Sequence, residues 1–388
     1  MVGRPIKEDW PACSRVVHIA GGILATSEIQ TDRVRLWPLT TNGKVCQIKI
    51  DTFGALYGSL GKLNLNIIGV EFITHQMEFT GQAPTQFRGL IKQESIWPNW
   101  DATSLWGGLT LSAFHNKNGL AYDLSNRINF QLHTINDRIK NLSLAYHQQL
   151  NARNLGKNFK EGQRFQDGYT NLVYQEFHSF LFDAGIMRDY LCEYIFNFAN
   201  GGDLNRVIKQ VLNNSKLEVT TASGLLKGLK KVVSLTDLES NLKDIMSKDG
   251  WLYELGQYRD LVMHSAPINL ANSQLYAIQE IIELPEGQKI MSVRFPLPAN
   301  PSELYSERSK RTNFDKYINQ FKELSKLSLE NRGKYDCLEY AHKVFGLLSN
   351  LSLEVAKESP YKPMEQTYFL TQEGNISSAS YVEDKYIL

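Results

Sequence analysis

The stretch that decides the fold runs from Leu124 to Leu150 and reads LSNRINFQLHTINDRIKNLSLAYHQQL. Apolar side chains recur in it every three or four residues, the period that gathers side chains on one face of an α-helix. They are Leu124, Ile128, Leu132, Ile135, Ile139, Leu142, Tyr146 and Leu150. The pattern predicts a long amphipathic helix whose apolar face is buried.

A second long helix is predicted downstream, where an apolar run extends from Tyr169 to Ala199. The polar segment 151–168 separates the two runs, and Asn200-Gly201-Gly202 follows the second as a helix terminator. We therefore expect the two helices to lie antiparallel to one another.

Shorter helices are predicted from about Thr220 to Val233 and from Thr236 to His264. Thr236 and Glu239 match a capping box, in which each side chain accepts a hydrogen bond from the other residue's backbone N–H. Gly250 is a point at which the second stretch can divide.

Two strands are predicted beyond these helices, from Leu275 to Glu283 and from Lys289 to Leu297. Pro285-Glu286-Gly287 joins them as a turn, which predicts a β-hairpin inserted around residues 274–298. The last helices are expected at 314–329 and 333–357.

From Val16 to about Phe114 the sequence predicts short strands rather than helices. Runs at 34–37, 45–50 and 63–72 alternate or carry β-branched residues, and Asn42-Gly43 is a hairpin-turn signal. Residues 94–106 are expected to form an aromatic-rich loop, followed by a strand at 109–114. The predicted fold class is α+β, with a β-rich N-terminal module at residues 1–118 and a helical domain at residues 119–388.

Composition restricts the classes of function. The 388 residues include 42 Lys and Arg against 41 Asp and Glu, so the chain lacks the charge excess of a protein that coats nucleic acid. Four distant cysteines, with no CxxC pair, argue against a disulfide framework or a zinc site and favour a reducing compartment. Without a secretory signal or a long apolar stretch, a cytoplasmic protein with no membrane partner is expected.

One short motif carries chemistry: Arg259-Asp260-Leu261-Val262-Met263-His264, three residues before Pro267. Proline ends the helix near this point, so the motif is expected at a helix terminus, where the dipole favours a protonated histidine. Residues five apart in an α-helix are separated by about 140° of rotation and about 7.5 Å of rise. Arg259 and His264 therefore share a face only if the last turn loosens, as the nearby proline allows.

The spacing between Arg and His does not by itself identify a functional motif, because Arg127 and His133 have a similar spacing inside the first long helix. The polar residue after Arg259 and the proline-limited helix end separate the two pairs. The structural alternative is that Arg259 and Asp260 form a solvated charge pair and His264 is an ordinary helix-end residue.

The motif resembles that of the HEPN superfamily, the higher eukaryotes and prokaryotes nucleotide-binding helical bundles. Its mark is an Arg, usually followed by a polar residue, and a His five to seven positions later, which Arg259, Asp260 and His264 match. The resemblance extends loosely to the helices from about residue 123 to 199 and 333 to 357, but not to residues 1–118 or the hairpin. It implies a HEPN-like antiparallel bundle, a homodimer and a metal-independent endoribonuclease without a cofactor, acting as a toxin or phage-defence effector.

The residue types suit that reaction. Cleavage of RNA by its own 2′-hydroxyl needs a proton acceptor, a proton donor and a cation for the phosphorane, and it leaves a 2′,3′-cyclic phosphate. His264 can transfer a proton near neutral pH, Arg259 can hold two phosphate oxygens, and Asp260 can orient either. One His supplies one group, so the second is expected from a second subunit.

The alternative function is a non-catalytic HEPN-like adaptor or RNA-binding subunit of a defence complex, with an antitoxin or another complex member as partner. The N-terminal module, which has no chemistry of its own, is expected to sense or gate.

Other polar groups are expected to be structural. Acidic residues on the second long helix could bind a metal but are more often solvated, and the pairs Glu176/His178 and Cys337/His342 lack further ligands. Three tryptophans could stack nucleobases but more often pin a segment to a core, and a short basic cluster is usually a solvated face. These acidic, aromatic and basic residues are Asp183, Asp189, Glu193, Trp97, Trp100, Trp106, Arg308, Lys310 and Arg311.

Overall fold

The computed structural model describes most of the chain outside the termini. The described residues are 14–27, 33–38, 40, 43–49, 53–73, 85–91, 96–155, 159–265, 276–284, 287–298, 301–302, 332–364, 368–370 and 376–378. The predicted helix at 314–329 and the basic residues Arg308, Lys310 and Arg311 lie outside them.

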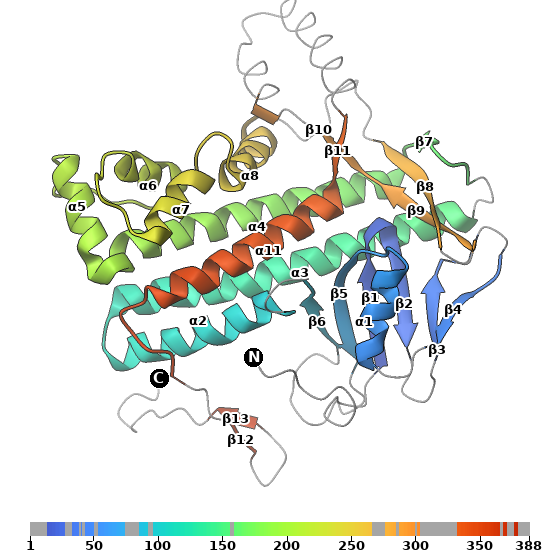
Figure 1. The fold of residues 1–388 in the computed structure, drawn as a ribbon, viewed down its shortest axis with the longest axis horizontal. Coiled ribbons are helices and arrows are strands. Elements are labelled where there is room, and N and C mark those ends of the chain that lie inside the picture. Colours follow the sequence, from blue (N-terminus) through green and yellow to red (C-terminus); the bar gives the residue numbers. More distant parts are fainter. Residues whose placement is uncertain are drawn as a thin grey trace, which may run out of the picture.

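Two long helices form the centre of the molecule, α3 (Gly119–Leu155) and α4 (Gly168–Phe198) (Figure 1). They are antiparallel, since Gln149 bonds Asp167 at one end while Gln131 bonds Asp183 nearer the other. All eight side chains of the predicted apolar stripe on α3 are fully buried. Both predicted helices are thus confirmed, together with the α+β class.

Two further helices complete the layer around α3 and α4: α2 (Pro98–His115) and α11 (Cys337–Lys357). The predicted aromatic loop and the strand at 109–114 are therefore wrong. Pro98 stands at the first helical position, where its missing N–H is not needed, so it begins a helix. Trp106 then lies fully buried, with its ring against Tyr194 and its Nε1 donating to the Ser352 carbonyl at 3.1 Å.

A six-stranded antiparallel sheet packs against the C-terminal half of α3 (Figure 1). Its order is β4-β3-β2-β1-β5-β6. The strands are β1 (Ser14–Ile19), β2 (Ile23–Ser27), β3 (Arg33–Trp37), β4 (Cys46–Lys49), β5 (Ile67–Ile73) and β6 (Thr85–Gly89). Strands were predicted at β3, β4 and β5, and Gly43 makes the predicted turn with φ 75°.

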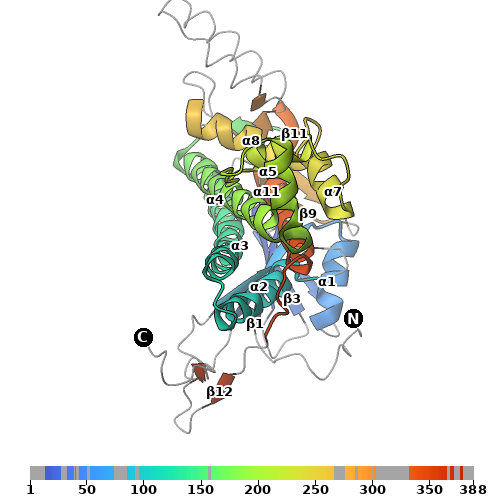
Figure 2. The same ribbon diagram turned by 90° about the vertical axis from the view of Figure 1, so that its left-hand side faces the viewer.

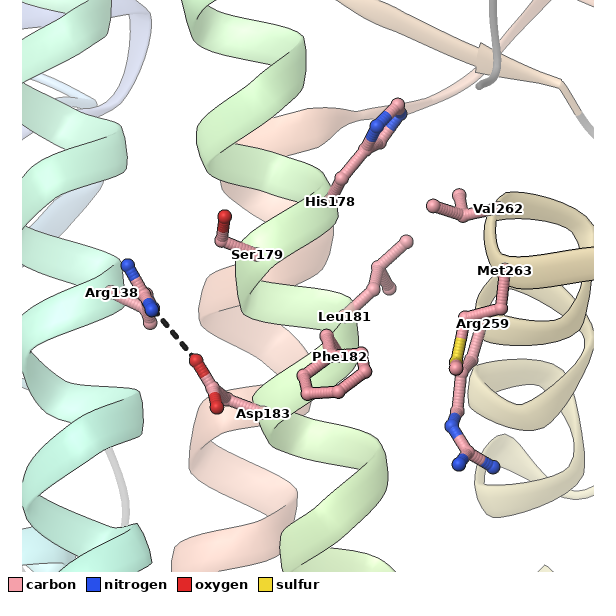
Figure 3. A pocket seen from close by; sticks show the side chains of 9 residues that line it. All are labelled: Arg138, His178, Ser179, Leu181, Phe182, Asp183, Arg259, Val262 and Met263. Carbon is pink, nitrogen blue, oxygen red and sulfur yellow. Dashed lines mark hydrogen bonds and ion pairs between the residues drawn. The ribbon is translucent and has the colours of Figure 1, made fainter. Parts of the chain in front are cut away.

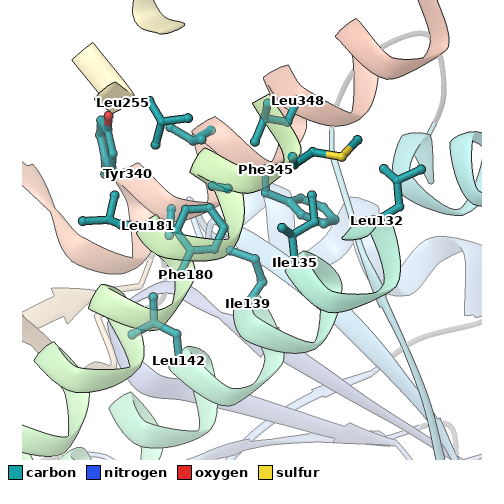
Figure 4. Close-up of a cluster of buried hydrophobic side chains, with 14 of the residues drawn as sticks. Leu132, Ile135, Ile139, Leu142, Phe180, Leu181, Leu255, Tyr340, Phe345 and Leu348 are labelled. Atoms are coloured by element: carbon teal, nitrogen blue, oxygen red, sulfur yellow. The ribbon is translucent and has the colours of Figure 1, made fainter. Parts of the chain in front are cut away.

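The expectation of strands rather than helices before residue 114 is wrong at a second place, because α1 (Phe53–Lys62) lies between β4 and β5. The predicted strand at 63–72 loses its first residues to the end of this helix, where Asn64 has φ 57°. The 3-10 turn η1 (Ala20–Gly22) joins β1 to β2 and contacts α3, with His147 Nδ1 2.8 Å from the Gly22 carbonyl. Buried residues of the sheet and of the helices belong to one continuous core. Figure 4 shows part of its helical portion, with side chains from α3, α4 and α11.

Short helices cover one side of α4: α5 (Asp203–Val211), α6 (Ala222–Leu229), α7 (Asp237–Ile245) and α8 (Trp251–Asp260) (Figures 1 and 2). The predicted terminator forms η3 (Ala199–Gly202), in which Asn200 and Gly201 have positive φ. The Thr236/Glu239 capping box is confirmed at α7, and Gly250 divides the stretch as the N-cap of α8.

The predicted hairpin is confirmed as β8 (Ala277–Glu283) and β9 (Lys289–Arg294), extended by β7 (Arg164–Phe165). β10 (Pro296–Pro298) pairs with β11 (Arg332–Asp336), so the helix expected from residue 333 begins at Cys337. Asp336 sets that start, because its carboxylate caps the backbone N–H groups of Leu338 and Glu339. A last pair is β12 (Tyr368–Leu370) with β13 (Ile376–Ser378).

The division predicted at residue 118 falls in the turn between α2 and α3, where Lys117 has φ 55°. It stays a prediction. Among the helices that the structure describes, none has an apolar segment that could cross a membrane.

Candidate functional site

The Arg-to-His motif lies where α8 ends. Arg259 and Asp260 occupy its last turn, and the backbone continues into a π-helical turn, η4 (Leu261–Ser265). A π turn closes its hydrogen bond between residues five apart, a wider turn than that of an α-helix, and such turns occur frequently at functional sites. The backbone is thus loosened at the place where the spacing of Arg259 and His264 requires it. The side chain of His264 lies outside the described residues.

Arg259 packs across the neighbouring helix α4. Its Nη1 lies 3.7 Å from Asp189 Oδ2, which is an ion pair but too long for a hydrogen bond. Gly185 of α4 makes room for it, because a Cβ there would stand 2.8 Å from Arg259 Nε and closer still to Cδ. The side chain is 23% exposed, and its Nε is buried without a hydrogen-bond partner among the described residues.

Asp189 connects three elements. Its Oδ1 accepts hydrogen bonds from Arg188 Nε at 3.0 Å and from the backbone N–H of Ala222, at the start of α6, at 3.2 Å. Arg188 is itself buried beside Gly256 of α8, where an added Cβ would meet its Nη1 at 2.7 Å. Asp189 therefore balances two arginines and ties α6 and α8 to α4, so it is not the solvated carboxylate that the structural interpretation expected.

A groove of about 280 Å³ crosses α4 beside the motif (Figure 3). Arg138 of α3 lies on one side of it, and Arg259, Val262 and Met263 lie on the other. Between them the surface of α4 presents Phe182, whose ring is 45% exposed. The groove thus combines two guanidinium groups with an open aromatic face.

Arg138 is held by Asp183, the second acidic residue singled out on α4. Its Nε donates to Asp183 Oδ2 at 2.7 Å, while Gln131 Nε2 donates to Asp183 Oδ1 at 3.2 Å. Asp183 and Asp189 both face arginines rather than each other. No group of potential metal ligands occurs among the described residues, so the metal interpretation of these carboxylates has no support.

His178 of α4 also lines the groove, and Figure 3 shows it beside Val262. Its Nε2 is buried and has no hydrogen-bond partner within the described part of the chain. Burial lowers the pKa of His178 to about 4, so the ring is neutral at neutral pH. From the sequence, His178 was considered only as a metal ligand together with Glu176, although residues 178, 182, 185 and 189 follow the helical period and share one face of α4.

Asp260 is half-buried and takes part in no ion pair within the regions that the structure describes. The comparison pair in α3 is clearly separate: Arg127 binds Asp123 at 2.8 Å on the surface, and His133 is exposed. Of the remaining candidates, Cys337 is buried and His342 Nε2 donates to the Leu90 carbonyl at 2.8 Å. The structural interpretation holds for these.

The other tryptophans also pack. Trp97 lies edge-on to Tyr57 and Phe72, and Trp100, which is 37% exposed, has Arg88 over its ring at 3.9 Å. Both support the expectation that aromatic residues in this region pin a segment to the core rather than stack on a ligand.

A second polar cluster joins the sheet to α3 and resembles a hydrolase triad in composition. Ser143 Oγ lies 3.0 Å from His18 Nδ1, and His18 Nε2 lies 3.5 Å from Glu71. The close contact with His18 Nε2, together with the ion pair to Lys140 at 3.2 Å, lowers the pKa of Glu71 to about 2. Because His18 and Ser143 are fully buried, no substrate can reach the hydroxyl, and the cluster fixes β1 on α3.

Searches against family models, curated proteins and solved structures returned no match to this chain. The residues around Arg259 are therefore the basis on which a function is assigned.

Proposed function

We propose that the chain is a metal-independent endoribonuclease of the HEPN type, acting through Arg259, Asp260 and His264. The observation that carries the proposal is the π-helical turn η4, which begins directly after Asp260 and includes position 264. Residues at i and i+5 diverge on a regular α-helix, and this turn reduces that divergence where the motif needs it.

The environment of Arg259 supports a role in binding phosphate. The ion pair with Asp189 holds the guanidinium group of Arg259 in position. At 3.7 Å, however, it leaves the N–H donors free, whereas a short bidentate pair would occupy them. A guanidinium in this state can hold two phosphate oxygens and stabilise the charge of the phosphorane. His264 would exchange the proton of the 2′-hydroxyl, and Asp260 would orient the motif.

In the proposed mechanism a homodimer brings two copies of the motif to one cleft, which supplies a base and an acid together. The N-terminal sheet would gate the site, and an antitoxin or another member of a defence complex would restrain it. The products would carry a 2′,3′-cyclic phosphate and a 5′-hydroxyl, because the 2′-oxygen displaces the 5′-oxygen of the next nucleotide.

A non-catalytic adaptor is the second candidate, and one observation favours it. Arg259 packs on Gly185 and pairs with Asp189, which in turn binds α6. An arginine that serves only to hold α8 against α4 would show the same contacts.

Cleavage of mixed RNA in EDTA distinguishes the two functions. Wild type is compared with Arg259→Ala and His264→Ala, and the matched controls are Arg127→Ala and His133→Ala, which alter the surface pair on α3. The enzyme proposal predicts cyclic-phosphate ends from wild type and both controls, with loss of cleavage in the two motif variants.

Cleavage that persists in both motif variants contradicts the assignment. Absence of cleavage in every protein favours the adaptor or an inhibited toxin, and expression toxicity relieved by His264→Ala would identify the latter.

A further inference from the structure

The groove beside Arg259 contains an exposed aromatic side chain, Phe182. Phe182 lies on α4 between the buried residues Leu181 and Asp183, yet 45% of it remains exposed. It stands where the groove crosses the helix, with charged side chains from two other elements on either side (Figure 3). A single exposed apolar side chain is ordinary on a protein surface, so its surroundings decide its meaning.

Those surroundings contain two arginines. Arg138 and Arg259 both line the groove, and each is paired with a carboxylate of α4: Arg138 with Asp183, which also lines the groove, and Arg259 more loosely with Asp189 at 3.7 Å. The hydrogen bond to Asp183 engages Arg138 through Nε. Arg138 is 36% exposed, so a ligand in the groove can reach its guanidinium from solvent.

We propose that this groove binds single-stranded RNA, with one nucleobase stacked on Phe182 and the neighbouring phosphates held by Arg138 and Arg259. The inference rests on the proposed function, because it names the substrate form and the recognition residues of that site. An aromatic face flanked by cations is the arrangement by which proteins hold single strands, whose bases are free to stack on a side chain. Bases inside a duplex are already stacked and paired, so Phe182 favours the single strand.

Binding is best measured in the full chain carrying His264→Ala, so that the probe stays intact. The probe is a fluorescein-labelled 12-nucleotide uridine RNA, followed by anisotropy. Phe182→Ala should weaken binding by about 5- to 150-fold, the range for loss of one stacked base. Phe182→Trp should retain the affinity, because indole stacks at least as well as phenyl.

Two further variants complete the design. Phe130→Ala is the matched control, since Phe130 is 69% exposed on α3 and does not line the groove, and it should bind like the parent. Arg138→Gln should lower the slope of log affinity against log salt by about one, the signature of a lost phosphate contact. Melting temperatures verify that each variant is folded.

The inference is overturned if the parent does not bind the RNA, if Phe182→Ala binds as well as the parent, or if Phe130→Ala loses as much. It is also overturned if Phe182→Ala changes only the sedimentation of the protein, because the ring would then belong to a contact between copies. Binding that depends on Phe182, without cleavage by wild type and without expression toxicity, would support the groove and reject the nuclease. Cleavage that depends on Arg259 and His264 but not on Phe182 would do the reverse.

Discussion

Gly185→Ala is the sharpest perturbation of the candidate site, because it adds one methyl group beneath Arg259 without substituting a residue of the motif. The new Cβ would stand 2.8 Å from Arg259 Nε, whereas ordinary contacts begin at 3.4 Å, so the guanidinium must move by at least 0.6 Å. The same change gains up to about 1 kcal/mol of helix propensity, since Gly185 lies inside α4. We therefore expect a folded protein of nearly unchanged stability in which Arg259 is misplaced.

The measurable consequence is a separation of activity from stability. Misplacement of a catalytic group by about 1 Å can reduce the rate about 100-fold, so cleavage should fall by roughly 10- to 100-fold. Urea unfolding should differ from wild type by less than about 1 kcal/mol. Gly168→Ala, at the first residue of the same helix and with nothing within 4 Å of the added Cβ, is the control and should leave both quantities unchanged.

Two results would refute this reasoning. Full cleavage by a stable Gly185→Ala protein would mean that the position of Arg259 does not limit the reaction. A loss of several kcal/mol of stability would mean that Arg259 cannot move, and that its contact with α4 is chiefly structural.

Three other substitutions test the fold around the site. His178→Gln should make the stability of the protein less sensitive to acid. Burial lowers the pKa of His178 to about 4 in the folded protein from 6.5, so the unfolded chain binds the proton first and the free energy of unfolding falls as pH drops from about 6.5 to about 4. In urea unfolding, the free energy of unfolding of wild type should fall by about 2 kcal/mol more than that of the variant between pH 7 and pH 5, and equal losses would contradict the burial of the ring. Trp106→Ala should lower the free energy of unfolding by about 3 to 5 kcal/mol, because its indole is fully buried. Trp100 is 37% exposed, so Trp100→Ala should lower it by about 1 kcal/mol or less. Similar losses in the two variants would contradict the packing of α2 described above. Asp336→Ala should cost roughly 3 kcal/mol, since it removes the cap of α11 and leaves the buried N–H of Phe295, now bonded at 2.8 Å, without an acceptor; a melting temperature within 2 °C of wild type would argue against it.

The long helices could be predicted because their signal is local. The apolar stripe of α3 repeats over 27 residues, and every member of it is buried. The capping box of α7 and the Asn-Gly-Gly terminator after α4 depend only on neighbouring residues, which is why they were read correctly. Strands β3 and β4 on either side of Gly43, and the β8–β9 hairpin, could likewise be predicted from residues that are close together in the sequence.

The region of α2 was misread because its decisive contacts are distant in sequence. Pro98 and the clustered tryptophans indicate a loop by composition, yet proline also begins helices. Trp106 is fixed by Tyr194 of α4 and by the Ser352 carbonyl of α11, partners 88 and 246 positions away. Only tertiary packing decides between a loop and a helix here, and local sequence patterns do not reveal that packing.

The candidate site could also be predicted only in part from the sequence. The residues of the motif are contiguous and could be named from the sequence, and the proline downstream indicated that the turn would loosen. The groove could not be named, because it joins Arg138 of α3, Phe182 of α4 and Met263 of η4. The helical period of α4 puts Phe182, Gly185 and Asp189 on one face, but only the packing of α8 across that face makes it part of a site. A site of this kind is made where a motif-bearing helix crosses another helix, so the crossing face of α4 must be tested together with the motif.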